Sequence, residues 1–389
     1  MIRILCFTDY YLPGFKAGGP IVSISNLIEG MGDGYEFLVV TRNHDLNDSE
    51  IYRNIKSNQW NTTGKAKVFY LGSTNLSLKI YWKLMLESSA YDVIYFNSFF
   101  SPRLTIVPLL IAKLFKFAIK KPVIIATHGE FSPNALNIKW LKKIIYLTAF
   151  KIFGLDRNIV WHASTTFEAE DIKRTIPHAA DSIYIAKNSS PMINKKNLGI
   201  TKEREPGALR MVFLSRVSRM KNLDFFLRIL KEVKSPVNFS IYGPIEDLKY
   251  WAICLELISQ LPDWIIVKYN GEISRDKLSE AILPYDLFVL PTLGENYGHV
   301  IIESLSFGTP VLISDKTSWE SDLSGGVTVI SLDSPNDWIT EVERWTSFTN
   351  QELTLKRTKA LEYVIIHFQN DMSMTQHKLM FNDAISKFQ

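Results

Sequence analysis

The chain has 389 residues, of which 46% are hydrophobic and 22% charged, and this balance excludes a disordered or fibrous protein. The net charge of +4 is too small to argue for nucleic-acid binding. A chain of this length exceeds what one hydrophobic core usually organises, so we expect two domains. The two cysteines, Cys6 and Cys254, lie far apart in apolar stretches, which predicts neither a disulfide framework nor a zinc site.

The first residues of the chain enter an apolar strand at once, without the features of a signal peptide. The sequence therefore predicts a cytoplasmic protein. The longest apolar runs, residues 106–119 and 144–155, contain lysines and are shorter than the roughly 20 residues that span a bilayer. No transmembrane helix is expected.

In the first half of the chain, short apolar runs alternate with amphipathic segments. This alternation predicts a parallel sheet with helices on both faces. The expected strands are residues 2–8, 37–41, 68–71, 93–97, 123–127 and 159–163, and the expected helices are residues 21–31, 76–89, 104–117, 136–153 and 166–175.

The same pattern restarts after a polar stretch at residues 188–207, whose composition is typical of a linker. We therefore expect an N-terminal domain over residues 1–190, a linker over 191–207 and a second domain over 208–365. A final helix is expected at 366–389, and it could pack on the N-terminal domain. The expected strands of the second half are residues 209–214, 237–242, 264–268, 287–291, 310–313 and 326–330.

Ligands of open parallel sheets bind at the loops that lead from a strand into a helix N-terminus, so we expect the functional residues in these loops. The three-glycine dinucleotide fingerprint is absent from both halves, which argues against a nicotinamide or flavin dehydrogenase. Gly18 and Gly19 follow the first strand, where open backbone N–H groups and a helix N-terminus could hold an anion. A tight turn without a ligand explains the same pair.

The first strand of the second half runs into a basic loop that contains Arg216 and Lys221. A planar guanidinium and a point charge beside a helix N-terminus suit two adjacent phosphates. A solvated basic loop is the alternative interpretation.

Residues 287–313 predict a buried strand, a glycine-rich loop, a short helix and a second buried strand. Glu303 falls on an otherwise apolar helix face, where a carboxylate is costly unless it accepts hydrogen bonds. The vicinal hydroxyls of a ribose would supply them, and an intrahelical or capping pair is the alternative. Glu295, in the preceding loop, can reach sugar hydroxyls.

These two glutamates, with seven residues between them and followed by Gly308, Thr309 and Pro310, resemble the signature of the family 4 retaining glycosyltransferases. The resemblance implies the α/β GT-B fold, with two Rossmann-like parallel-sheet domains facing across a cleft, and C-terminal helices. It extends to Gly18-Gly19, Thr127-His128-Gly129, His162-Ala163-Ser164, the Arg216 and Lys221 loop, and Tyr242-Gly243.

The family resemblance implies that the second domain binds a nucleoside diphosphate sugar. Arg216 and Lys221 would then contact the diphosphate, Glu303 the ribose and Glu295 the transferred sugar. Further donor-binding residues would be Gly18, Gly19, Gly243, Asn296, Tyr297 and Gly298. Ala186-Lys187-Asn188-Ser189-Ser190 replaces the Pro-Asn-Gly turn of many relatives, which leaves the hinge and the base contacts open. Tyr297 stands where Phe is frequent, a minor change because the aromatic body is kept.

His128 closes an N-terminal strand, and the resemblance places it beside the donor sugar and the acceptor, through its side chain or its backbone carbonyl. Glu130, two residues later, is an acceptor-side candidate, and a solvated loop carboxylate is the alternative. By resemblance, the catalytic set is His128, Arg216, Lys221 and Glu295.

Fixed cations at the departing diphosphate are the natural catalyst of such a transfer, so neither a metal nor another cofactor is expected. Asp45 and Asp48 have the wrong spacing for a metal-binding Asp-x-Asp pair. By resemblance, the anomeric configuration is retained, with no covalent nucleophile.

The segment Lys139–Lys143 interleaves lysines with apolar residues at helical spacing. It could rest on an anionic membrane surface, or form a core helix with a solvated basic face. The expected acceptor is a glycan or a polyprenyl-diphosphate-linked sugar. Membrane binding would favour the lipid-linked sugar, as in bacterial surface polysaccharide assembly. Two other functions remain: a sugar-nucleotide epimerase of the same fold, and a non-catalytic nucleotide-sugar-binding subunit.

Overall fold

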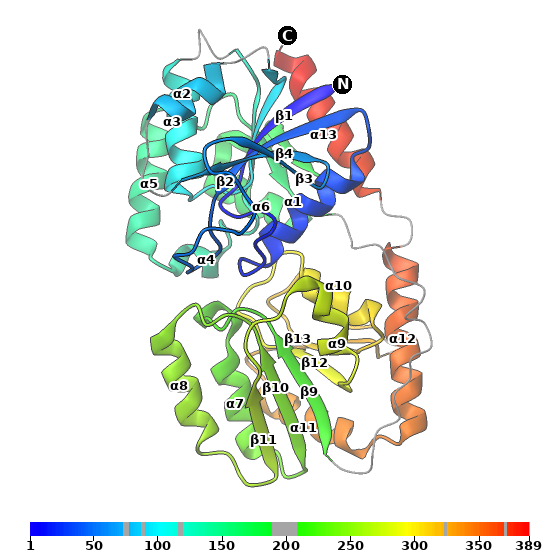
Figure 1. Ribbon diagram of the computed structural model, residues 1–389. Coiled ribbons are helices and arrows are strands. Elements are labelled where there is room, and N and C mark those ends of the chain that lie inside the picture. The colour runs from blue at the N-terminus through cyan, green and yellow to red at the C-terminus, as the bar shows by residue number, and fades with distance from the viewer. Residues whose placement is uncertain are drawn as a thin grey trace. The chain divides into compact units, whose positions relative to one another are not determined.

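The computed structural model describes residues 1–72, 78–86, 90–115, 120–188, 208–322, 325–368 and 372–388 (Figure 1). The chain divides into two compact units, one of Met1–Ser189 with Asp371–Gln389, the other of Ser190–Asn370. The expected linker at residues 191–207 lies outside the described residues.

The first unit is built on an eight-stranded sheet in the order β3-β4-β2-β1-β5-β6-β7-β8. All neighbouring pairs are parallel except β3 with β4. The strands are β1 (Ile2–Phe7), β2 (Tyr35–Arg42), β3 (Trp60–Thr63), β4 (Ala66–Leu71), β5 (Val93–Phe96), β6 (Val123–Ala126), β7 (Val160–Ala163) and β8 (Ile183–Ile185). The edge strands β3 and β8 were not predicted, because both are short and only partly buried.

Both faces of this sheet are covered. Successive residues of β1 point to opposite faces, so that Leu5 and Phe7 enter one core cluster while Ile4 and Cys6 enter the other. The helices are α1 (Gly19–Gly30), α2 (Leu78–Leu86), η2 (Pro102–Ile106), α3 (Val107–Leu114), α4 (Pro133–Asn137), α5 (Trp140–Ile152), α6 (Thr166–Thr175), η3 (Pro177–Ser182) and α13 (Ser373–Phe388). The first cluster includes residues of α2, α3, α5 and α6, and the second includes residues of α1 and α13.

The single helix predicted over residues 136–153 is wrong. The structure has α4 and α5 instead, because Ile138 is extended and Lys139 has a left-handed backbone with φ of 55°. Neither conformation continues a right-handed helix.

The second unit is a six-stranded parallel sheet in the order β11-β10-β9-β12-β13-β14, with helices on its faces. Its strands are β9 (Leu209–Leu214), β10 (Val237–Tyr242), β11 (Ile265–Tyr269), β12 (Leu287–Leu290), β13 (Val311–Ser314) and β14 (Val327–Ile330). Its helices are η5 (Arg219–Lys221), α7 (Leu223–Glu232), α8 (Leu248–Ile258), η6 (Arg275–Lys277), α9 (Leu278–Ile282), α10 (His299–Ser306), α11 (Pro335–Ser347) and α12 (Asn350–Phe368).

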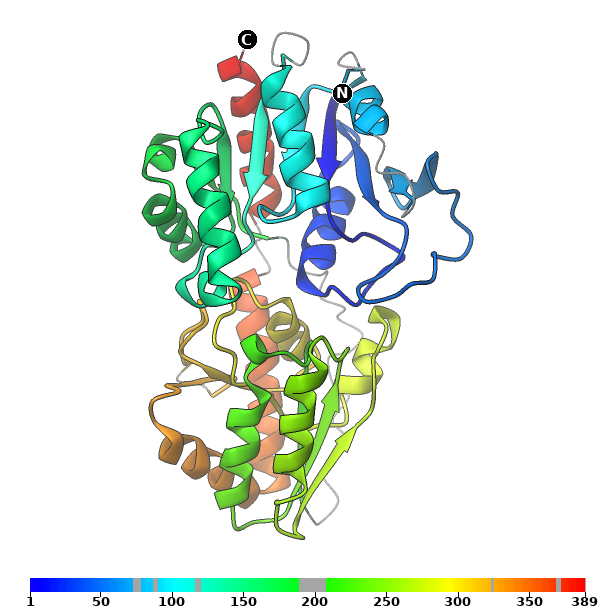
Figure 2. The same cartoon turned by 90° about the vertical axis from the view of Figure 1, so that its left-hand side faces the viewer.

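The last helix, α13, follows the second unit in sequence but packs on the first (Figures 1 and 2). The ring of Phe381 lies edge-on to Phe37 and Tyr95, with centroid distances of 6.2 and 5.7 Å. His377 packs against His162 of β7 at 5.0 Å. A buried aromatic ring on α13 therefore holds the chain's end on the first sheet.

Candidate functional site

In the second unit, the loop after β9 and the loop after β12 are fastened together. The backbone N–H of Leu293 donates to the carbonyl of Met220 at 2.8 Å. The side-chain amide of Asn222 donates to the carbonyl of Pro291 at 3.0 Å. Asn222 caps α7 with a left-handed φ of 54°, a conformation that Asn tolerates well. Two loops from separate strands thus form one surface at the carboxyl edge of the sheet.

Lys221 and Glu295 meet on this surface. The ammonium of Lys221 donates to Glu295 Oε2 at 2.6 Å, and the two side chains are only 10% and 20% exposed. The structure therefore brings together a cation and a carboxylate that the sequence assigned to different parts of one ligand. Arg216 is paired elsewhere, with Glu246 at 2.9 Å, at a more exposed position.

The Glu295 loop is held from its other side by the loop after β13. The N–H of Glu295 donates to the carbonyl of Lys316 at 3.1 Å. The Ser318 hydroxyl donates to the carbonyl of Asn296 at 2.8 Å, and the Trp319 indole donates to that of Tyr297 at 2.9 Å. Three consecutive residues of the predicted donor loop are therefore fixed in place, by residues that the sequence did not single out.

Two predicted donor-site glycines are required by geometry. Gly298 begins α10 with φ of 75°, and a Cβ there would lie 2.7 Å from Ile301 Cδ1. Gly243 has φ of 131°, and a Cβ there would lie 2.0 Å from the carbonyl oxygen of Ser215. Any side chain at Gly243 would push the loops after β9 and β10 apart.

Glu303 lies on α10 and is 8% exposed. Its ion-pair partner within the described residues is Arg275 at 3.7 Å, which lies on η6 and not on the same helix. Burial raises the pKa of Glu303 to about 7, although Arg275 opposes the shift. A carboxylate with one distant partner retains acceptor capacity for a ligand.

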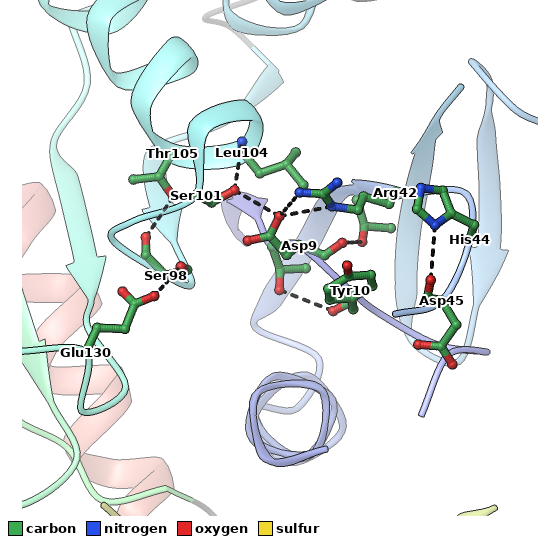
Figure 3. A network of polar contacts seen from close by, with 12 residues as sticks. Asp9, Tyr10, Arg42, His44, Asp45, Ser98, Ser101, Leu104, Thr105 and Glu130 are labelled. Atoms are coloured by element: carbon green, nitrogen blue, oxygen red, sulfur yellow. Dashed lines mark hydrogen bonds and ion pairs between the residues drawn. The ribbon is translucent and has the colours of Figure 1, made fainter. Parts of the chain in front are cut away.

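In the first unit, the loop after β1 leads into α1, where Gly18 caps the helix with φ of 69° and Gly19 is its first residue. Asp9, in the same loop, accepts hydrogen bonds from Arg42 at 2.6 Å and from Ser101 at 2.9 Å. Figure 3 shows Asp9 between these two residues: Arg42 ends β2 and Ser101 lies beyond β5, and these two strands flank β1 in the sheet. Three strand ends are thus joined by one carboxylate.

Glu130 is not a solvated loop carboxylate, so that interpretation is wrong. One oxygen accepts from the Ser98 hydroxyl at 2.9 Å (Figure 3). The other accepts from the backbone N–H of Phe99 at 2.5 Å and of Phe100 at 3.3 Å. Burial raises its pKa to about 7, against these hydrogen bonds and nearby Lys143. Glu130 therefore fastens the loop after β5 to the loop after β6.

His128 has a left-handed backbone with φ of 47°, and its Nε2 lies 2.6 Å from Oδ1 of Asn97. The residues on either side of His128 are bound by Glu168 of α6, through the Thr127 hydroxyl at 2.6 Å and the Gly129 N–H at 2.7 Å. Sequence reasoning assigned no role to Asn97 or Glu168. Two features of the sequence could have pointed to these residues. Asn97 is the last residue of the expected strand 93–97, and Glu168 lies three residues after the helix cap Thr165, as in a capping box.

Helix α5 combines lysines with exposed apolar side chains. Trp140 is 59% exposed and Ile145 61%, while Leu147 and Phe150 of the same helix are buried. Lys143 is held over the ring of Phe100, with its ammonium donating to the carbonyl of Ala135 at 2.6 Å. The exposed face is thus apolar as well as basic.

The described residues contain no group of three or more His, Cys, Asp or Glu side chains arranged to hold a metal ion. None of their helices is both long enough and apolar enough to cross a bilayer.

Residues 208–347 match the sequence profile described as "Glycosyl transferases group 1". The chain is 25% identical over 378 residues to the alpha-monoglucosyldiacylglycerol synthase of Streptococcus pneumoniae, covering 86% of this chain and 79% of that protein. The structure is similar to Anabaena HepE in complex with UDP-glucose, with a TM-score of 0.70, 15% identity and full coverage of both chains. It is also similar to sucrose-phosphate synthase of Thermosynechococcus elongatus, with a TM-score of 0.72, 13% identity and full coverage of both. The predicted GT-B class, with two Rossmann-like domains, is confirmed.

Proposed function

We propose that the chain, whose residues 208–347 match the profile of the group 1 glycosyltransferases, moves a sugar from a nucleoside diphosphate sugar to a glycan or polyprenyl-diphosphate-linked acceptor. The proposal is supported by the side chains that meet at the carboxyl edge of the second sheet. There, Lys221, Glu295 and Glu303 come from neighbouring elements, all three with little exposure to water.

The Lys221–Glu295 ion pair suits an exchange of partners. An incoming diphosphate carries more charge than a carboxylate, so Lys221 would turn to it, supported by the N-terminus of α7. Glu295 would then be released to accept hydrogen bonds from sugar hydroxyls. Arg216 would leave Glu246 for the same diphosphate, because that pair is exposed and therefore weak.

The chemistry we propose is metal-independent and retains the anomeric configuration. As the bond from sugar to phosphate breaks, negative charge builds on the leaving diphosphate and positive charge on the sugar ring. Lys221 and Arg216 would stabilise the first, a kind of electrostatic contribution worth about 3 to 4 kcal/mol. The acceptor hydroxyl would attack on the face that the phosphate leaves, with no covalent intermediate on the protein.

For the first unit we propose peripheral binding to the inner face of an anionic membrane, through α5, in surface polysaccharide assembly. Its exposed Trp140 and Ile145 would enter the interface, and each nearby lysine adds about 1 kcal/mol of attraction. The name of the Streptococcus relative, a glycolipid synthase, agrees with a lipid-linked acceptor. Flotation with anionic vesicles should be lost in Ile145→Ser and kept in Ile266→Ser, a matched change at an exposed isoleucine of β11.

The transfer itself is tested by product analysis. UDP-glucose and other nucleotide sugars are incubated with polyprenyl-diphosphate-linked sugars, and the anomeric protons are followed by NMR with and without a metal chelator. We expect a new glycosidic bond with the configuration of the donor, unaffected by the chelator. An altered nucleotide sugar without a new bond would mean an epimerase instead. Nucleotide-sugar binding without consumption would mean a non-catalytic subunit.

A further inference from the structure

The ring of His128 lies in the loop after β6 and is bound by the side chain of Asn97. Its Nε2 and Oδ1 of Asn97 are 2.6 Å apart, which is a short hydrogen bond. Neutral histidine can carry its proton on either ring nitrogen, and an asparagine amide can face either way. The groups around Asn97 therefore decide which of the two side chains donates.

The surroundings of Asn97 fix the direction of this bond. The Thr8 hydroxyl lies 3.2 Å from the carbonyl of Tyr10, and because a carbonyl only accepts, Thr8 is the donor there. The Thr8 oxygen can then accept from the amide nitrogen of Asn97, at 3.2 Å. The carbonyl of Pro20 lies 3.5 Å from the same nitrogen. Since the nitrogen of the amide faces these two oxygens, its own oxygen faces His128.

It follows that Nε2 of His128 carries the proton and donates it to Asn97. In the neutral ring, Nδ1 then holds a lone pair. Among the residues that the structure describes, Nδ1 has no hydrogen-bond partner. The ring therefore offers an acceptor, which would attract a hydroxyl and repel a phosphate or carboxylate oxygen.

Glu168 holds the backbone that carries this ring. It is 2% exposed, and its two oxygens accept from the Thr127 hydroxyl, the Gly129 N–H and both the N–H and the hydroxyl of Ser164. These bonds join the loop after β6 to the start of α6. The left-handed φ of His128 is thereby fixed from both sides.

We propose that Asn97 and Glu168 are positioning residues that hold His128 as its Nε2–H tautomer, with Nδ1 presented to a hydroxyl of a bound sugar. The sugar in this statement rests on the proposed function, whereas the tautomer does not. The charged and titratable groups around His128 are Glu168 on α6, His162 on β7 and His377 on α13. Burial and His162 lower the pKa of His128 to about 4, against the opposing effect of Glu168, so the ring is neutral near pH 7.

The test is ¹⁵N NMR of the full chain labelled at its seven histidines, with His128→Gln to assign the resonance. Two other rings serve as references in the same spectrum. His377 donates from Nδ1 to the carbonyl of Ser373 at 2.8 Å, and His162 donates from Nε2 to that of Ala186 at 2.8 Å. We expect His128 to show the His162 pattern at pH 7. The His377 pattern at His128 would overturn the proposal.

Two variants separate positioning from a merely structural role. Asn97→Asp keeps an acceptor for Nε2–H and adds a negative charge, so the tautomer should persist and the pKa of His128 should rise. Glu168→Gln removes a negative charge, so the pKa should fall further with the tautomer kept. Shifts of both variants in one direction, or none, would contradict the proposal. Asn97→Leu, which cannot accept, should let the Nδ1–H form appear; an unchanged tautomer would also contradict it.

Steady-state kinetics with UDP-glucose, or with whichever nucleotide sugar is consumed, show which substrate carries the hydroxyl that contacts Nδ1. Asn97→Leu should lower kcat/KM by roughly three- to tenfold, the worth of one hydrogen bond. A higher KM for the nucleotide sugar would place the hydroxyl on the donor, and a higher KM for the acceptor would place it there; unchanged kinetics would remove the sugar contact. A chain that consumes no nucleotide sugar would defeat the proposed function, while the NMR result would still decide the tautomer.

Discussion

The carboxyl edges of the two sheets stabilise their polar groups in different ways. In the second unit, the predicted site residues form ion pairs, Lys221 with Glu295, Arg216 with Glu246 and Glu303 with Arg275. In the first unit, Asp9 also forms an ion pair, with Arg42, but Glu168 and Glu130 are bound by hydroxyls and backbone N–H groups. An ion pair can exchange partners when an anion arrives, whereas a carboxylate with several neutral donors holds a loop in place. The ion-paired edge of the second unit therefore suits the binding of a charged ligand, whereas the hydrogen bonds of Glu168 and Glu130 fix loop backbone in the first unit.

The largest expected effect breaks the ion-paired edge. In Lys221→Ala, the diphosphate loses its buried cation, and Glu295 keeps an unpaired charge beside it. We expect kcat/KM to fall about 10²- to 10³-fold, or about 3 to 4 kcal/mol, in a steady-state assay of nucleotide release. Lys249→Ala, which changes an exposed lysine of α8, is the control and should leave the rate unchanged.

The next effect breaks the hydrogen-bonded edge. Glu168→Ala leaves the buried donors of Thr127, Gly129 and Ser164 without their acceptor, which should cost about 3 kcal/mol in the free energy of unfolding. Chemical denaturation measures this. The matched change Glu170→Ala removes an exposed carboxylate of the same helix and should cost less than about 0.5 kcal/mol. Equal losses in the two variants would refute the role given to Glu168.

A smaller effect comes from pH. The pKa of Glu303 is raised from 4.5 to about 7 by folding. Between these two pH values, the folded chain therefore keeps a proton on Glu303 that the unfolded chain has lost. Its contribution to stability is complete below pH 4.5 and is lost as the pH rises through 7, by roughly 3 kcal/mol.

Glu303→Gln should flatten the pH dependence of the unfolding free energy between pH 5 and 8. Part of the slope should remain, because the pKa of Glu130 is raised in the same direction. If the slope is identical in wild type and Glu303→Gln, the carboxylate is not buried as described.

The smallest expected effect concerns the predicted donor loop. Trp319→Phe removes one hydrogen bond, to the carbonyl of Tyr297, and keeps an aromatic ring against Tyr363 of α12. We expect about 1 kcal/mol less stability and a few-fold higher KM for the nucleotide sugar. A calorimetric scan and initial-rate kinetics measure these. Trp264→Phe, at a half-exposed indole before β11, should change stability to a similar extent without changing KM.

Patterns within a short stretch of sequence predicted much of this structure. The strands at residues 209–214 and 237–242 and the helix at 166–175 have the predicted bounds, because apolar periodicity and local caps set them. Glu303 was singled out because a carboxylate in an apolar helix face is costly in any fold. Its burial agrees with that argument.

What escaped prediction depends on partners that are distant in sequence. Asn97 and His128 are 31 residues apart and meet only because β5 and β6 are neighbours in the sheet. Glu168 reads as an ordinary capping residue until Thr127 and Gly129 are placed beside it. The break at Lys139 also gave no signal, since lysine has no preference for a left-handed backbone.

We propose that the second unit binds a nucleoside diphosphate through Lys221 and Glu303. The most direct measurement is thermal stabilisation of the purified chain by UDP, GDP, ADP and dTDP, in wild type, Lys221→Ala and Glu303→Ala. A nucleotide at a hundredfold excess over its Kd should add about 2.7 kcal/mol of apparent stability. We expect one nucleotide to stabilise the wild type and neither variant. No stabilisation by any nucleotide, or equal stabilisation of all three proteins, would contradict the account.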